Sequence, residues 1–151
     1  MAQSLSKLYV HIIFHVKSTF QQIKKDDQTE LYSYMGYIIK QNDSIPIIIN
    51  GVGNHVHILC IMSKNIAFAK LAEEIKKNSS CWIKTKNRYY QNFGWQGGYI
   101  GFSVSQSVHD KTKKYIESQE EHHKNKSYKD EVKLFLKEYG VDYDEKYLWS
   151  D

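Results

Sequence analysis

The stretch HVHILCIM, His55 to Met62, decides the fold that this sequence predicts. It is apolar on both faces, which is typical of a central strand that is covered on two sides. Side chains alternate between the faces of a strand, so His55 and His57 are expected to project from the same face. The sequence therefore predicts a central strand that presents two imidazoles together.

Three elements are expected before this strand. Residues 8–16 (LYVHIIFHV) alternate like a strand and residues 26–40 have helical spacing. Residues 44–49 read as a second strand, whose early Pro46 indicates an edge position or a strand start. The turn at residues 50–54 contains two glycines, which we expect to supply the positive φ that a hairpin needs. The first strand is expected to carry Val10, Ile12, Phe14 and Val16 on one face and Tyr9, His11, Ile13 and His15 on the other.

The elements expected after this strand complete a βαββαβ order. They are a helix from Ile66 to about Arg88, a strand at residues 97–105, a helix from Val108 to about Lys124 and a short helix at residues 128–139. Asn65 and Ser107 are predicted to cap the two longer helices. This order predicts an α+β fold, a ferredoxin-like split βαβ antiparallel sheet with an added C-terminal helix that bears a tyrosine. With no internal repeat or linker, residues 1–151 are predicted to form a single domain.

Composition narrows the class of protein. The 151 residues are 41% hydrophobic and 14% aromatic, as in a folded globular chain. The longest apolar runs, such as Ile45 to Ile49, are too short to span a bilayer. The N-terminus lacks the features of an export signal, and Cys60 and Cys81 make no disulfide framework. We therefore expect a cytoplasmic protein with no membrane partner.

The positive charge is concentrated in one segment. Net charge is +4, and residues 67–90 hold six basic and two acidic residues, which gives the same +4. A local basic stripe is expected of a protein that binds a phosphate backbone, although a solvated helix face has the same composition. The predicted DNA contacts are Lys76, Lys77, Lys84, Lys86 and Arg88.

Tyr115 and Gln119 lie four residues apart, so they share one face of the predicted helix. A phenol titrates near pH ~10, so Tyr115 needs help to act as a nucleophile at neutral pH. A divalent ion can help by polarising a scissile phosphate. His55, His57 and the Gln119 carbonyl oxygen are candidate neutral ligands, a set that suits Mg²⁺ or Mn²⁺ and, lacking a carboxylate, leaves the ion its full charge. Taken separately, the two histidines are better interpreted as buried structural residues and Tyr115 as a half-buried helix residue, and the combination favours the functional interpretation.

Other side chains are assigned structural roles. His11 and His15 are about 13 Å apart along a strand, too far to share a metal, although one of them could lie near the site. His122 and His123 are expected to be solvated. Trp95 could stack on a splayed base, but core packing is the favoured interpretation.

Four stretches together resemble the single-tyrosine HUH transposases of the insertion-sequence 200/605 group. They are NHVHILC at residues 54–60, WQGGYIGFSVSQS at 95–107, KKYIESQEEHH at 113–123 and GVDYDEKYLW at 140–149. In that family the metal-binding histidines correspond to His55 and His57, the nucleophile to Tyr115 and the third metal ligand to Gln119.

The resemblance implies a metal-dependent homodimer that acts on single-stranded DNA. Such enzymes recognise hairpins near the element ends, cleave to leave a 5′-phosphotyrosine link and a free 3′-OH, and rejoin the ends. It also implies that the tyrosine helix of one protomer serves the histidines of its partner. Two alternatives stay open: a domesticated relative that processes repetitive palindromic DNA, and a non-catalytic ferredoxin-like module that binds single-stranded nucleic acid.

Overall fold

The computed structural model describes residues 2–17 and 22–151, and within them the elements follow the predicted order. The strands are β1 (Leu8–His15), β2 (Ile45–Val52), β3 (His55–Met62) and β4 (Ile100–Val104). The helices are α1 (Lys25–Gln41), α2 (Phe68–Lys86), α3 (His109–Glu117), α4 (Gln119–His122), α5 (Tyr128–Glu138) and α6 (Glu145–Leu148), and a short 3-10 helix spans Arg88–Tyr90. The βαββαβ order and the α+β class are confirmed.

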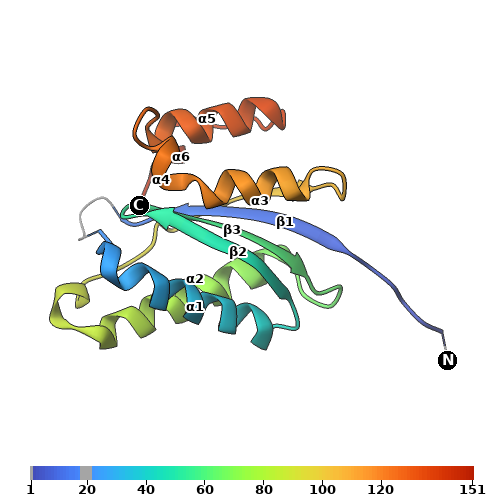
Figure 1. The fold of residues 1–151 in the computed structure, drawn as a ribbon, viewed down its shortest axis with the longest axis horizontal. Helices are drawn as coiled ribbons and strands as arrows, with labels where there is room; N and C mark the ends of the chain where they lie inside the picture. Colours follow the sequence, from blue (N-terminus) through green and yellow to red (C-terminus); the bar gives the residue numbers. More distant parts are fainter. Residues whose placement is uncertain (1, 18–21) are drawn as a thin grey trace.

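The four strands form one antiparallel sheet in the order β2-β3-β1-β4. Strand β3 is central, as its two apolar faces predict, and Pro46 lies in the edge strand β2. Helices α1 and α2 cover one face of the sheet, whereas α3 and α5 lie across the other face (Figure 1). None of the described helices is both long enough and apolar enough to cross a membrane.

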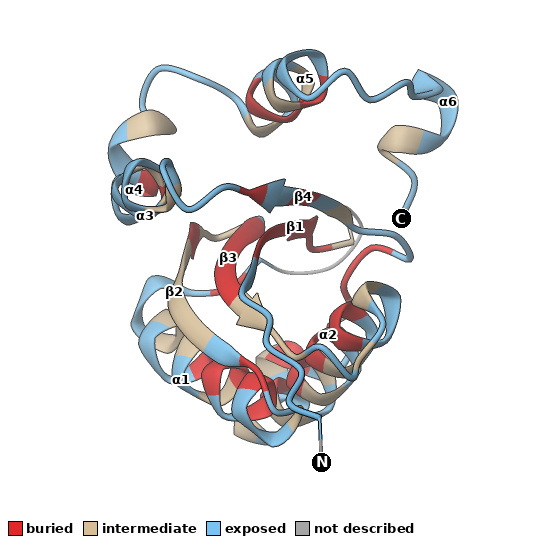
Figure 2. Ribbon diagram, turned by 90° about the vertical axis from the view of Figure 1, so that its right-hand side faces the viewer, coloured by how far each residue is buried: buried red, intermediate tan, exposed pale blue. Residues whose placement is uncertain are grey.

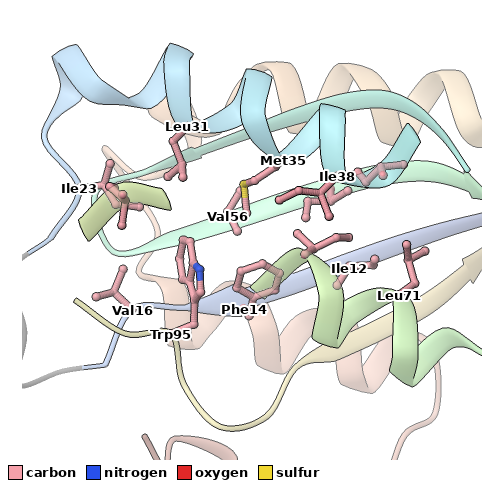
Figure 3. Close-up of a cluster of buried hydrophobic side chains, with 14 of the residues drawn as sticks. Ile12, Phe14, Val16, Ile23, Leu31, Met35, Ile38, Val56, Leu71 and Trp95 are labelled. Atoms are coloured by element: carbon pink, nitrogen blue, oxygen red, sulfur yellow. The ribbon is translucent and has the colours of Figure 1, made fainter. Parts of the chain in front are cut away.

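The larger core lies between the sheet and α1 and α2 (Figures 2 and 3). Ile12 and Phe14 of β1 are fully buried there, on the face that the alternation of β1 predicts. Trp95 packs in the same cluster, with its ring centroid 4.7 Å from that of Phe14, and its indole donates to Ser79 Oγ at 3.0 Å. Core packing of Trp95 is thus confirmed.

Two smaller apolar clusters hold the C-terminal helices on the other face of the sheet. Ile116 of α3 packs against Tyr9, Leu59 and Val104. Val132 and Leu136 of α5 pack against Ile13 and Phe102. These contacts place α3 and α5 on the face from which the β3 histidines project.

The two glycines of the β2–β3 hairpin, Gly51 and Gly53, do not have the positive φ that the sequence analysis expects. Strand β2 continues to Val52, and among the described glycines only Gly140 has a positive φ. Gly51 is required by close packing instead, because a Cβ on it would stand 2.9 Å from the Val56 Cα and collide with the His55 carbonyl oxygen.

Both predicted helix caps are wrong. Helix α2 begins after Ala67, so Asn65 lies outside it, and Ala67 makes no side-chain cap hydrogen bond. Helix α3 begins after Val108, and the Ser107 hydroxyl bonds to the Ser105 hydroxyl at 3.0 Å instead. The predicted single helix from residue 108 to about 124 is also interrupted at Ser118, between α3 and α4.

Candidate active site

His55 and His57 lie side by side on the β3 face that α3 and α5 cover, and neither is exposed to solvent. The Nδ1 of His55 is 2.7 Å from Asn54 Oδ1, and the Nδ1 of His57 is 2.8 Å from His11 Nε2. Each imidazole is therefore held by one nitrogen, and its Nε2 is left for the site. Partners of this kind fix ring orientation in metal-binding histidines.

Tyr115 approaches the same place from α3. Its ring centroid is 6.0 Å from that of His57, and its hydroxyl donates to the carboxylate of Glu131. The ring also stacks on His122 at 4.4 Å. Because Ile116 anchors α3 on the sheet, the half-buried tyrosine is held over the histidines of its own chain.

Gln119 is fully buried at the start of α4. Its Oε1 lies 3.3 Å from His55 Nε2 and 3.2 Å from His123 Nε2. The break before it has a tertiary cause: the Asn50 side chain donates to the Ile116 and Glu117 carbonyls, at 2.9 and 3.2 Å, at the end of α3. The structure thus brings together Tyr115, His55, His57 and Gln119, all four predicted site residues.

Glu131 is a site residue that the sequence analysis missed. It lies in the first turn of α5 and is 1% exposed. Its Oε1 is 2.8 Å from His57 Nε2 and 3.4 Å from His55 Nε2, and its Oε2 accepts from Gln119 Nε2 at 3.3 Å. One signal could have found it, since Glu131 shares the helical stripe of Tyr128, Val132 and Phe135 that faces the sheet.

His122 and His123 are partly buried and contact the site, whereas the sequence analysis expected them to be solvated. His122 stacks on Tyr115, and His123 Nε2 lies 3.3 Å from Glu131 Oε2. The reason is tertiary, because α4 is folded back onto the site after the break at Ser118. His11, assigned a structural role, contacts the site through His57.

The polar groups fit a small divalent ion. One nitrogen of His55, one of His57 and one oxygen of Glu131 all lie within 4.8 Å of one another. Neighbouring ligands about 2.1 Å from one ion stand about 3 Å apart, close to the spacings of 2.8, 3.3 and 3.4 Å among these groups and Gln119 Oε1. A carboxylate, that of Glu131, also lies among these groups, which the expected set of neutral ligands did not include.

Burial sets the charge of the site. It lowers the pKa of His55 to about 4, so this imidazole is neutral and can donate its lone pair. Burial alone would raise the pKa of Glu131, but its contacts with the imidazoles of His123, His55 and His57 outweigh that effect and hold the pKa well below its usual range. Burial, and then the hydrogen bond to Glu131, raise the pKa of Tyr115. The site therefore holds an ionised carboxylate beside a protonated phenol.

The predicted DNA-binding residues lie away from this site. Helix α2 is on the opposite face of the sheet (Figure 1), where Lys76, Lys77 and Lys84 line a hollow of about 510 Å³. Lys86 is paired with Glu30 and lies 3.7 Å from Asp27, while Arg88 is exposed in the 3-10 helix.

Comparison with known proteins identifies the family. A family model described as "Transposase IS200 like" matches residues 4–119. A crystal structure from Deinococcus radiodurans R1, provisionally identified as a transposase, has a TM-score of 0.60 and 20% identity, with 79% of this chain and 98% of that chain covered.

The structure of a REP-associated tyrosine transposase bound to a REP hairpin has a TM-score of 0.53 and 11% identity, with 79% and 70% covered. At these identities the two structures support the fold alone. A comparison with curated proteins gave no match. The family match runs from before β1 to Gln119 and includes both β3 histidines and Tyr115, so the chain belongs to the family of IS200-like transposases.

Proposed function

We propose that this transposase cleaves and rejoins single-stranded DNA at hairpin-marked ends, with Tyr115 as its nucleophile. One observation carries the proposal. The Tyr115 hydroxyl, from a helix, and the His55 and His57 imidazoles, from a strand, meet at the same buried carboxylate. A nucleophile beside a cluster of metal-binding groups is the arrangement that phosphoryl transfer requires.

His55, His57 and Gln119 would hold the ion, which we propose to be Mg²⁺ or Mn²⁺. Their nitrogen and amide oxygen donors suit those ions, and the histidine Nε2 atoms face the site. When bound, the ion would supply positive charge to a scissile phosphate beside Tyr115. His11 and Asn54 would keep the two imidazoles in the orientation that binding needs.

The reaction that we propose conserves the phosphodiester. The Tyr115 oxygen forms a bond to phosphorus as its proton passes to solvent water. The bond from phosphorus to the 3′-oxygen breaks, and that oxygen takes a proton from water. The products are a 5′-phosphotyrosine link and a free 3′-OH. Attack by the 3′-OH of another end reverses the chemistry and releases Tyr115, so that joining needs no external energy.

The substrate is proposed from the family. A REP-associated transposase of similar fold is bound to a REP hairpin in its structure, which supports a DNA hairpin as the feature that this chain binds. From the family we also propose that the protein acts in the cytoplasm of a prokaryotic cell. A domesticated relative would use the same residues, and flanking hairpins that bound a mobile unit would distinguish transposition from host processing.

The test is the substitution Tyr115→Phe. We expect incubation of the wild type with single-stranded end DNA and Mn²⁺ to give a covalent protein–DNA band on a denaturing gel. The Phe variant should lose the band and all cleavage while keeping hairpin affinity, because only one hydroxyl is removed. Tyr147→Phe, at a residue 64% exposed, is the matched control and should cleave normally.

Two outcomes would contradict this proposal. A Tyr115→Phe protein that still cleaves at a comparable rate would show that another group makes the attack. Equal cleavage of a duplex with the same end sequence would show that the substrate is not single-stranded DNA.

A further inference from the structure

We propose that Glu131 is a fourth metal ligand, supplied by α5. The inference rests on the proposed function, because it adds a carboxylate to the metal site of the same reaction. Glu131 Oε1 lies 2.8 Å from His57 Nε2 and 3.4 Å from His55 Nε2. With Gln119 Oε1 it would give a set of two nitrogens and two oxygens, and a Mg²⁺ or Mn²⁺ ion held by them could still bind a phosphate oxygen and water.

A bound metal ion would explain why the Glu131 carboxylate is buried. Glu131 is 1% exposed, and a buried carboxylate is costly unless it is paired or bound to a metal. Among the described residues, the basic groups in contact with it are the imidazoles of His55, His57 and His123. A divalent cation between Glu131 and the two strand histidines would supply positive charge to this buried carboxylate, and the three side chains offer ligand atoms within 4.8 Å of one another.

Packing, rather than charge, places Glu131 in the site. The next residue, Val132, and Leu136 one turn later are buried against Ile13 and Phe102. The Ser127 hydroxyl caps the helix by accepting from Asp130 N at 3.2 Å. The carboxylate is therefore held in position before any ion arrives, as a preorganised ligand should be.

Helix α5 lies outside the residues that the family model matches, which end at Gln119. Glu131 is therefore not part of the pattern by which the chain was assigned to its family. The role that we propose for Glu131 therefore comes from the structure of this chain and not from the family match.

The second carboxylate oxygen would connect the ion to the nucleophile. Glu131 Oε2 accepts the hydrogen bond of the Tyr115 hydroxyl and that of Gln119 Nε2. A carboxylate that binds the ion through Oε1 would thereby hold the Tyr115 oxygen close to the metal. It would also reduce the net charge of the occupied site from +2 to +1, and it would favour an ion that prefers oxygen ligands.

The test is Mn²⁺ binding without DNA, measured by electron paramagnetic resonance on wild type, Glu131→Gln and Glu138→Gln. Glutamine keeps the shape of the side chain and removes its charge. We expect Glu131→Gln to weaken Mn²⁺ binding by about tenfold or more, and Glu131→Asp to lose less than Glu131→Gln. Glu138→Gln, at an exposed position of the same helix, should bind like the wild type.

An unchanged or increased Mn²⁺ affinity of Glu131→Gln would overturn the inference. A carboxylate that merely fills the site would compete with the ion, so Glu131→Gln would then bind Mn²⁺ as well as the wild type or better. Thermal unfolding in the presence of chelator shows whether the Glu131→Gln protein is folded. If it is not, the Mn²⁺ affinity of Glu131→Asp is compared with that of the wild type instead. Failure of the proposed function is a different result, namely normal Mn²⁺ binding with no covalent DNA adduct.

Discussion

At the scale of single residues, the candidate site consists of buried polar side chains that hold one another. His57 is oriented by His11, His55 by Asn54, and Gln119 lies between His55 and His123. Buried polar groups keep a defined geometry only while their partners are present, because a lost partner leaves a donor or acceptor unsatisfied. The consequence of each substitution therefore depends on how many proposed ligands survive it.

Gln119→Ala should weaken cleavage in a way that added metal restores. His55 and His57 remain in this variant, so we expect metal affinity to fall by about 10- to 100-fold while the chemistry at saturation changes little. His57→Ala loses a nitrogen ligand and should recover less at the same Mn²⁺ concentration. The measurement is cleavage rate against Mn²⁺ concentration, and wild-type cleavage that persists in excess chelator would refute the metal assignment.

Sequence reasoning found the residues whose spacing is local and missed those brought in by packing. His55 and His57 share a face because a strand has a period of two, and Gln119 lies near Tyr115 although the helix breaks between them. Glu131 and His123 could not be placed from spacing, since their position depends on how α5 and α4 dock on the sheet. The apolar stripe around Glu131 was the available signal, since it places this carboxylate on the helix face that packs on the sheet.

At the scale of elements, the β2–β3 hairpin fixes the position of His55. Gly51 pairs with Val56 in the sheet, directly beside the histidine strand. Gly51→Ala should lower the free energy of unfolding by about 1–3 kcal/mol, because the added methyl meets the backbone at His55 and Val56. Thermal unfolding measures this, and Gly98→Ala, whose added Cβ has no neighbour closer than 3.8 Å, is the control. Equal melting temperatures for the two variants would count against this close approach of the two strands at Gly51.

The lysines of α2 give a second prediction at this scale. Lys76, Lys77 and Lys84 line one hollow, and if they contact a hairpin stem their joint replacement by alanine should weaken hairpin binding and make it less salt-dependent. Three lost phosphate contacts correspond to a decrease of about 2 to 3 in the slope of log K against log salt. A triple replacement of Lys133, Lys137 and Lys146 removes the same charge on the C-terminal helices. A larger loss of hairpin affinity from that control set would show that the DNA binds the C-terminal helices rather than α2.

Elements were more predictable than their ends. The alternation in β1 and the two apolar faces of β3 reflect burial that the sheet imposes, so the pattern and the structure agree. The end of α3 was not predictable, since it is capped by Asn50, far away in sequence. Residue types that cap helices are also common in loops, where they take part in other local hydrogen bonds. The Asn65 backbone N–H donates to the Ser63 hydroxyl, and the Ser107 hydroxyl bonds to that of Ser105.

At the scale of the whole molecule, the site joins two parts of the chain. The sheet supplies the histidines, while α3, α4 and α5 supply Tyr115, Gln119 and Glu131 from one covering layer (Figure 1). In the single chain these parts meet in cis. The connection between β4 and α3, residues 105–108, is exposed, and its first three residues are polar. An exchange of the covering layer between two protomers would preserve the same contacts.

We propose that the working enzyme is a homodimer with this exchange, so that each Tyr115 serves the partner's histidines. Heterodimers of Tyr115→Phe and His57→Ala protomers test it, at a Mn²⁺ concentration at which neither variant cleaves alone. With exchange, the tyrosine of the His57→Ala chain meets the intact histidines of the other chain, so one of the two sites is fully wild type. If the sites act independently, each heterodimer should then have about half of the wild-type cleavage activity. Without exchange every site keeps one lesion and mixing rescues nothing. Heterodimer formation is verified by pull-down with two tags. Confirmed heterodimers without activity would mean that Tyr115 acts on the histidines of its own chain, as the single chain already places it.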